Sequence, residues 1–196
     1  EAATACIAGG GILRRPGGAV AVEDLRPGDR VLTATGESVR IDWIGARLYR
    51  REGRRPTFFR ISAGAFGNTG PKRTMTVGAA AHLLLEDRRC LPLVGTPRAF
   101  APIAAFEDGE TVLRIVPAGD VPVYGIACVT QAAVVVSGLS IETFHPAHAV
   151  AACAGEAFRA DLARLIPLDF DGTGFAPARI PRLSLSEART LVRPAD

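Results

Sequence analysis

Residues 6–45, CIAGGGILRRPGGAVAVEDLRPGDRVLTATGESVRIDWIG, contain the strongest structural signal in the chain. The stretch opens with a cysteine and a run of glycines, after which short apolar segments alternate with turn sequences. In the turn at residues 26–29, proline presets φ and glycine supplies a positive φ, so the chain is expected to reverse there. Three short strands joined by tight turns predict a β-meander.

The composition is typical of one β-rich globular domain. The chain has 196 residues, 48% of them hydrophobic, which is enough for a substantial core. Its 21 glycines and 14 prolines indicate many turns. The net charge of +3 is small, and we interpret the arginines within residues 47–60 as a solvated loop. A nucleic-acid surface would need more interleaved aromatic side chains, so we predict no nucleic-acid partner.

The four cysteines, Cys6, Cys90, Cys128 and Cys153, have neither CxxC nor Cys/His ligand spacing. We therefore expect no metal and no cofactor, and the cysteines are too sparse for a disulfide scaffold. No run of 18 apolar residues occurs, which predicts no membrane span. Because the chain begins with Glu1 rather than methionine, we expect it to be a fragment or a processed product.

The pattern of short strands and turns ends near Glu142, and helical spacing follows. Near the end of the chain, Ser184 and Glu187 form a capping box that predicts a short helix. The sequence therefore predicts an all-β domain over residues 1–150 and a short helical or loop extension over residues 151–196.

The opening stretch resembles the start of a Hint domain, the module shared by Hedgehog autoprocessing proteins and inteins, and is most similar to a bacterial subgroup. The shared residues are Cys6, Gly10, Val22-Glu23-Asp24-Leu25, Pro27-Gly28-Asp29, Val31-Leu32-Thr33 and Trp43-Ile44-Gly45. The resemblance resumes at residues 62–68 and 71–85, continues more loosely at residues 138–144, and covers residues 6–148 in all. It implies a compact Hint-type β fold.

The resemblance also implies a self-cleaving chemistry that begins at Cys6. In Hint domains the first cysteine attacks the carbonyl of the preceding residue, so the scissile bond here joins Ala5 and Cys6. This N–S acyl shift gives a thioester, and a second nucleophile then releases the upstream segment of the precursor, which is the expected partner. Backbone N–H groups of the glycine run are candidate oxyanion donors. The departing nitrogen needs a proton, for which His82 is the candidate donor.

The histidine motif departs from the family pattern, which reads Val-Ser-Pro-x-His. Residues 77–85 read VGAAAHLLL. Aligned without a gap, Gly78 takes the serine position and Ala81 the histidine position, and His82 follows one residue later. A one-residue shift in a strand moves a side chain to the opposite face. We therefore expect His82 to reach Cys6 only if a bulge absorbs the extra residue.

Two further family signatures are missing. Val129 and Gln131 occupy the positions of a downstream Asp-x-His motif, and no His-Asn pair occurs, so full splicing is not expected.

Two hypotheses remain. In the first, the chain is an autocatalytic, cysteine-dependent Hint domain in which Cys6 is the nucleophile and His82 assists. In the second, it is a Hint-fold module that has lost catalysis, with Cys6 a buried thiol, and acts as a structural or interaction domain. A generic β domain that binds a small ligand is a weaker third alternative. Compartment and oligomeric state stay open, with a secreted or cell-surface location among the alternatives.

Overall fold

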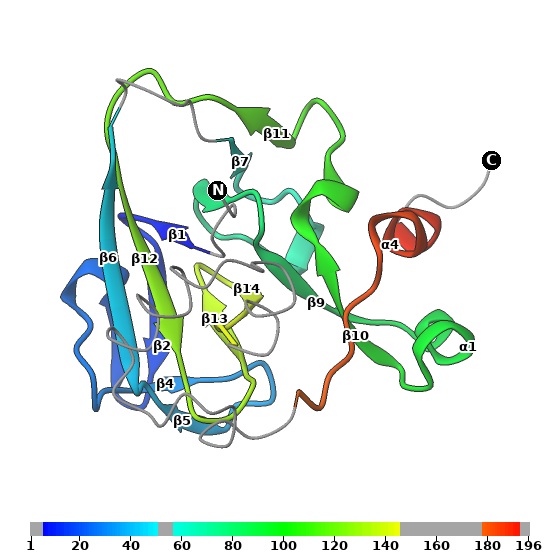
Figure 1. The fold of residues 1–196 in the computed structure, drawn as a ribbon, viewed down its shortest axis with the longest axis horizontal. Coiled ribbons are helices and arrows are strands. Elements are labelled where there is room, and N and C mark those ends of the chain that lie inside the picture. The colour runs from blue at the N-terminus through cyan, green and yellow to red at the C-terminus, as the bar shows by residue number, and fades with distance from the viewer. Residues whose placement is uncertain (1–5, 51–56, 146–177, 193–196) are drawn as a thin grey trace, which may run out of the picture.

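The computed structural model describes residues 6–50, 57–145 and 178–192. Within these ranges, two six-stranded antiparallel sheets and a two-stranded ribbon make up most of the fold (Figure 1). The helices are short. The prediction of an all-β fold is therefore confirmed.

The first sheet has the strand order β11-β7-β8-β1-β12-β6. Its strands are β1 (Ile7–Ala8), β6 (Trp43–Tyr49), β7 (Phe58–Ile61), β8 (Met75–Gly78), β11 (Val112–Ile115) and β12 (Val121–Ala127). The second sheet has the order β10-β9-β14-β13-β2-β3. Its strands are β2 (Ile12–Arg15), β3 (Gly18–Ala21), β9 (His82–Glu86), β10 (Arg98–Pro102), β13 (Ala133–Val136) and β14 (Leu139–Glu142).

The remaining elements connect or cover the sheets. The ribbon pairs β4 (Arg30–Leu32) with β5 (Ser38–Arg40). The short helices are η1 (Val22–Asp24), η2 (Gly67–Thr69), η3 (Arg88–Cys90), α1 (Leu91–Val94), η4 (Ile103–Phe106) and α4 (Leu185–Val192).

The expected β-meander in residues 6–45 is wrong in its pairing. β3 pairs with β2 in the second sheet, and β4 pairs with β5 in the ribbon. β6 pairs with β12 in the first sheet. All seven residues of β6 pair with β12. A ladder between β6 and β5 would be shorter, because β5 has only three residues. The longer ladder satisfies more backbone groups, so the distant pairing prevails over the local one.

The core lies between the two sheets and draws heavily on the opening stretch. Leu13, Val22, Val31 and Ile41 are each fully buried and pack with side chains from both sheets. Burying a side chain of this size stabilises the fold by about 1.5–3 kcal/mol. The opening stretch therefore decides the fold by supplying both its turns and part of its core.

The glycine run carries the chain from β1 in the first sheet to β2 in the second. Gly10 has a φ of +83°, a left-handed conformation that favours glycine. A Cβ atom on Gly11 would lie 2.5 Å from Cγ2 of Ile7 and 3.3 Å from Cγ1 of Val136. Close packing across the turn therefore requires glycine at position 11.

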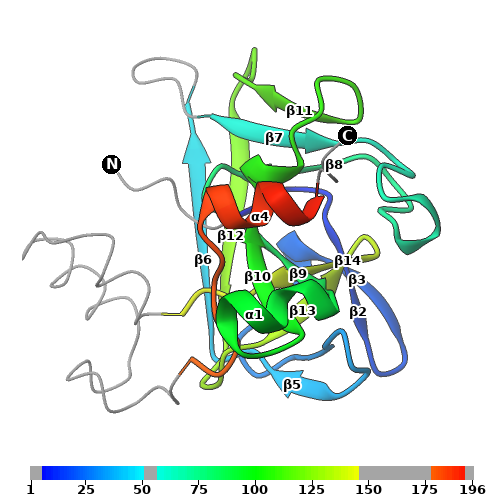
Figure 2. The same cartoon turned by 90° about the vertical axis from the view of Figure 1, so that its right-hand side faces the viewer.

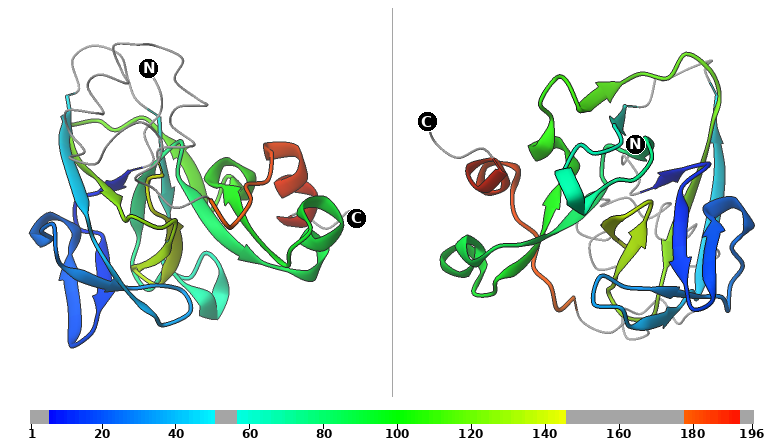
Figure 3. Two further views of the ribbon diagram at one scale, coloured as in Figure 1. Left: turned by 60° about the horizontal axis from the view of Figure 1, so that its bottom comes forward. Right: turned by 180° about the vertical axis from the view of Figure 1, so that it is seen from behind.

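Residues 178–192 return to the edge of the second sheet and run beside β10, and α4 and α1 lie on the same side of the molecule (Figures 2 and 3). A parallel bridge joins Arg182 to Phe100 of β10. The backbone N–H of Leu183 donates to the carbonyl of Phe100 at 2.9 Å. We call residues 178–192 the C-terminal segment.

The predicted capping box is present at the start of α4. The backbone N–H of Ser184 donates to the carboxylate of Glu187 at 2.8 Å, and the backbone N–H of Glu187 donates to the Ser184 hydroxyl at 3.2 Å. Ala5 and residues 146–177, which include much of the predicted extension, lie outside the described residues. No helix in the described ranges is long and apolar enough to cross a membrane.

Candidate active site around Cys6

Cys6 lies directly before β1, where the chain enters the first sheet. Its side chain packs with Phe58 and Val123, and the residue is only 5% exposed. The backbone N–H of Gly78 donates to the Cys6 carbonyl at 2.9 Å. The next residue, Ile7, pairs with β8 and β12 on its two sides. The position of the cysteine is therefore fixed by backbone pairing as well as by packing.

Burial keeps the Cys6 thiol protonated. Removal from water disfavours the thiolate and raises the pKa of Cys6 to about 11, and a hydrogen bond with the Gly78 backbone only partly opposes this rise. The thiolate is the stronger nucleophile. Attack by Cys6 near neutral pH therefore needs a group that accepts the thiol proton.

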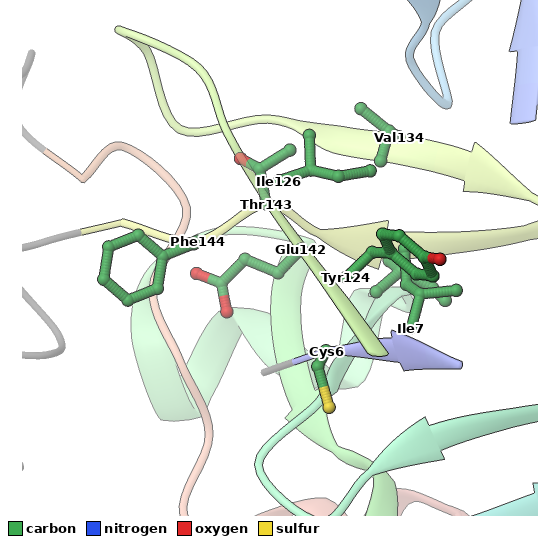
Figure 4. Close-up of a pocket in the computed structure, with 9 residues that line it drawn as sticks. Cys6, Ile7, Tyr124, Ile126, Val134, Glu142, Thr143 and Phe144 are labelled. Atoms are coloured by element: carbon green, nitrogen blue, oxygen red, sulfur yellow. The ribbon is translucent and has the colours of Figure 1, made fainter. Parts of the chain in front are cut away.

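A small pocket lies beside Cys6 (Figure 4). Its lining residues are Cys6, Ile7, Tyr124, Ile126, Val134, Ile141, Glu142, Thr143 and Phe144. Most of these residues are apolar, and Glu142 is the acidic residue among them. The Thr143 hydroxyl accepts a hydrogen bond from the Ala132 N–H and donates one to the Ala132 carbonyl, each at 3.2 Å. These bonds join the residue after β14 to the residue before β13. Cys6 and Glu142 therefore line the same pocket, and in Figure 4 the Cys6 sulfur points away from the Glu142 carboxylate.

Glu142 is a buried carboxylate whose oxygens are both hydrogen-bonded. Its side chain is 2% exposed. Oε1 accepts a hydrogen bond from Nε2 of Gln131 at 2.9 Å. Oε2 accepts a hydrogen bond from Nε of Arg182 at 2.8 Å and forms an ion pair with Nη2 of the same residue, also at 2.8 Å. A buried charge is tolerated only when it is paired in this way.

His82 lies next to Glu142. The Nδ1 atom of His82 is 2.9 Å from the carbonyl oxygen of Ala80 and 3.9 Å from Oε2 of Glu142. The first distance is a hydrogen bond in which Nδ1–H donates, and the second is an electrostatic contact. Glu142 therefore lines the same pocket as Cys6 and also lies near His82.

The extra residue before His82 is accommodated by a turn between the sheets, where a bulge was expected. β8 ends at Gly78 in the first sheet, and β9 begins at His82 in the second. The N–H of Ala81 donates to the carbonyl of Gly78 at 3.0 Å and closes this turn, and the Ala81 side chain is buried. The argument from strand faces therefore does not apply, because residues 79–81 are not in a strand.

The glycine run does not offer its N–H groups to an oxyanion. The N–H of Gly9 donates to the Pro122 carbonyl at 2.9 Å, and that of Gly11 donates to the Ala8 carbonyl at 3.3 Å. The N–H of Gly10 donates to the carboxylate of Glu23. These groups hold the turn between β1 and β2, and the expectation that they bind the oxyanion is not supported.

The described cysteines, Cys6, Cys90 and Cys128, are buried free thiols. In residues 6–50, 57–145 and 178–192, no group of three or more histidine, cysteine, aspartate or glutamate side chains is arranged to hold a metal ion. Among the described residues, Cys6, Glu142 and His82 are the candidate reactive groups at this site.

Sequence reasoning named Cys6 and His82 but missed the part played by Glu142 and Arg182. Glu142 was used only as part of the family resemblance, and Gln131 was noted only as a departure from it. A charged residue that follows the apolar Leu139 and Ile141 in a short strand is the local signal for Glu142. Arg182 is 40 residues away from it in the chain.

The fold and site together define an all-β domain with a buried cysteine at the entrance to its first strand and a carboxylate-containing pocket beside it. The model of the Hint domain family matches residues 5–148, and the chain belongs to this family. The match covers the candidate residues from Cys6 to Glu142 and stops before the C-terminal segment. Membership supports an autoprocessing type of function in general terms.

Solved structures with a similar fold include intein-like domains. The chain is similar to the solution structure of a bacterial intein-like domain from Clostridium thermocellum, with a TM-score of 0.50 and 14% identity over 72% of this chain and 99% of that chain. It is also similar to the crystal structure of the MchDnaB-1 intein, with a TM-score of 0.47 and 15% identity over 70% of this chain and 99% of that chain. No curated protein matches the sequence.

Proposed function

We propose that this domain cleaves its own chain at the bond between Ala5 and Cys6 through an N–S acyl shift. The observation that best supports this function is the placement of Cys6, at the start of the family match and beside the pocket that contains Glu142. The Sγ atom of Cys6 would attack the carbonyl carbon of Ala5. The bond from that carbon to the Cys6 nitrogen would then break and leave a thioester and a free amine.

Proton transfer is the demanding part of this reaction. The thiol must lose a proton although its pKa is raised to about 11, and the departing nitrogen must gain one. Glu142 is the proposed acceptor of the thiol proton because it is the carboxylate in the pocket. His82 is the proposed donor to the nitrogen. Because Nδ1 is held by the Ala80 carbonyl, its proton would be exchanged at Nε2.

The release of the upstream segment would follow by attack on the thioester. Water or an added thiol would attack the Ala5 carbonyl carbon, and the Cys6 thiol would leave. The product would be an upstream segment that ends at Ala5 and a domain that begins at Cys6.

A second candidate function is that of a structural or interaction module that has the Hint fold but no activity. Two observations favour it. The N–H groups of the glycine run are used to hold the turn, and burial keeps the Cys6 thiol neutral. Both would make the acyl shift slow.

A time course of cleavage separates the two functions. A folded tag fused upstream of Glu1 should be released from the wild-type chain and from Cys128→Ala, which removes another buried thiol, but not from Cys6→Ala. His82→Ala should slow release by about 10²-fold or more, the usual contribution of a general acid. Cleavage that persists in Cys6→Ala would exclude the thioester mechanism, and an uncleaved wild-type chain would favour the inactive module.

A further inference from the structure

The C-terminal segment reaches into the candidate site although it lies outside the matched family region of residues 5–148. The side-chain oxygen of Gln131 accepts hydrogen bonds from the backbone N–H groups of Arg179 and Ile180, at 2.9 and 2.8 Å. Nε2 of Gln131 donates to the Ile180 carbonyl at 3.1 Å as well as to Glu142. One glutamine therefore links the segment to the buried carboxylate.

The segment is anchored firmly enough to fix the position of Arg182. Leu183 lies directly after it and is 3% exposed, and its N–H donates to the Phe100 carbonyl. Beyond it, Ala188 and Leu191 of α4 join an apolar cluster with Cys90, Ala99, Ala101 and Ala105. The guanidinium of Arg89 donates to the Leu191 carbonyl at 2.9 Å. The contact between Arg182 and Glu142 is thus supported on both sides by packing and by hydrogen bonds.

Two basic groups approach the same oxygen of Glu142. Oε2 lies 2.8 Å from both Nε and Nη2 of Arg182 and 3.9 Å from Nδ1 of His82. A guanidinium is always charged, so it neutralises much of the carboxylate and weakens its attraction for a proton on the imidazole. The strength of the Glu142–His82 interaction therefore depends on Arg182.

We propose that Arg182 is a positioning residue that sets, through Glu142, the proton affinity of His82, so that the C-terminal segment forms part of the autoprocessing site. The effect on cleavage rests on the proposed function, but the effect on His82 does not. Among the described residues, the charged groups in this network include Glu142 of β14, which contacts the imidazole, and Arg182 of the C-terminal segment, which contacts the same Glu142 oxygen. From the other elements, β10 places Pro102 opposite His82, and Cys6 contributes a neutral thiol to the pocket.

The direct test is a titration of His82 by nuclear magnetic resonance in the full 196-residue chain, with the His82 signal assigned from a His82→Gln variant. Arg182→Gln removes the guanidinium that neutralises the Glu142 carboxylate, so the proton affinity of His82 should rise by about tenfold or more. Arg179→Gln is the matched control. It removes the same charge from the same segment, but the exposed Arg179 contributes only its backbone N–H to the network.

A double-mutant cycle shows whether the effect passes through Glu142. In a Glu142→Gln background, Arg182→Gln should leave the His82 titration unchanged. Arg182→Lys keeps the charge and should restore most of the wild-type titration. An unchanged titration in a folded Arg182→Gln chain, or an equal change in Arg179→Gln, would overturn the proposal. If Arg182→Gln fails to fold, Glu142→Gln tests the coupling that the proposal requires. It should lower the proton affinity of His82, and an unchanged titration would overturn the proposal.

The cleavage assay adds a readout that a purely structural role would not affect. If protonated His82 donates to the departing nitrogen, Arg182→Gln should move the alkaline limb of the rate–pH profile upward, whereas simple loss of structure would lower the rate at every pH. A wild-type chain that does not cleave would refute the proposed function and leave the titration result standing. Failure of the proposed function, seen as absence of cleavage, can therefore be distinguished from failure of the Arg182 proposal, seen as an unchanged His82 titration.

Discussion

Cys6 combines the position of a nucleophile with the ionisation behaviour of a buried thiol. Its pKa of about 11, against an ordinary value of 9.0, results from burial in the fold. Between pH 9 and pH 11 the Cys6 thiol ionises in the unfolded chain but stays protonated in the folded chain. The free energy of unfolding therefore falls as the pH rises from 9 toward 11. At the residue scale, the fold thus disfavours the thiolate form of Cys6.

The first prediction concerns the reactivity of this thiol. Alkylation of Cys6 in the folded chain by iodoacetamide should accelerate with pH to a midpoint near 11, because only the thiolate reacts. Mass mapping of the modified peptides separates Cys6 from Cys128, whose pKa burial raises to about 12. A midpoint near the ordinary value for Cys6 would show that the fold does not suppress its ionisation.

At the scale of single elements, the turn between β1 and β2 depends on a glycine that packing requires. Gly11→Ala should lower the free energy of unfolding by about 1–3 kcal/mol, because its Cβ would overlap Cγ2 of Ile7. Urea denaturation measures this loss. Gly119→Ala is the control, since a Cβ there would meet no atom within 4 Å. Equal stabilities for the two variants would contradict this description of the turn.

The capping box of α4 gives a second prediction at this scale. Ser184→Ala removes the hydroxyl that accepts from the Glu187 N–H and should cost about 1 kcal/mol in urea denaturation. Because α4 carries Ala188 and Leu191 into a buried cluster, the loss should appear in the main unfolding transition. A wild-type transition in Ser184→Ala would mean that the box contributes nothing to the stability of the domain.

For the whole molecule, the sequence was sufficient where local chemistry decides the structure. The turn at residues 26–29, the strands of the opening stretch and the cap at Ser184 each follow from a few neighbouring residues, and the structure contains all three. The pairing of β6 with β12 could not be predicted, because it joins segments about 80 residues apart and depends on how the two sheets pack. The turns within residues 6–45 favour pairing between neighbouring strands, but the seven-residue ladder with β12 takes β6 out of such a meander.

The candidate site was predictable only in the part that the family resemblance covers. Cys6 and His82 remain predictions as catalytic residues, and the position of Glu142, in the pocket lining with Cys6 and near His82, needed the structure. Arg182 has no sequence signal of its own, since its partner lies 40 residues earlier and both are charged residues of common types. Long-range ion pairs of this kind depend on the packing of the C-terminal segment, which no local pattern specifies.

The most direct test of the central claim is the intact mass of the tag released from the fusion in the presence of dithiothreitol. We predict a released tag that ends at Ala5 and carries a dithiothreitol thioester, and a domain whose mass begins at Cys6. Incubation without thiol should give the same tag as a free acid, more slowly, because water is the weaker nucleophile. A tag that ends elsewhere, a product without the adduct, or an unchanged fusion after days would contradict the claim that Cys6 forms a thioester.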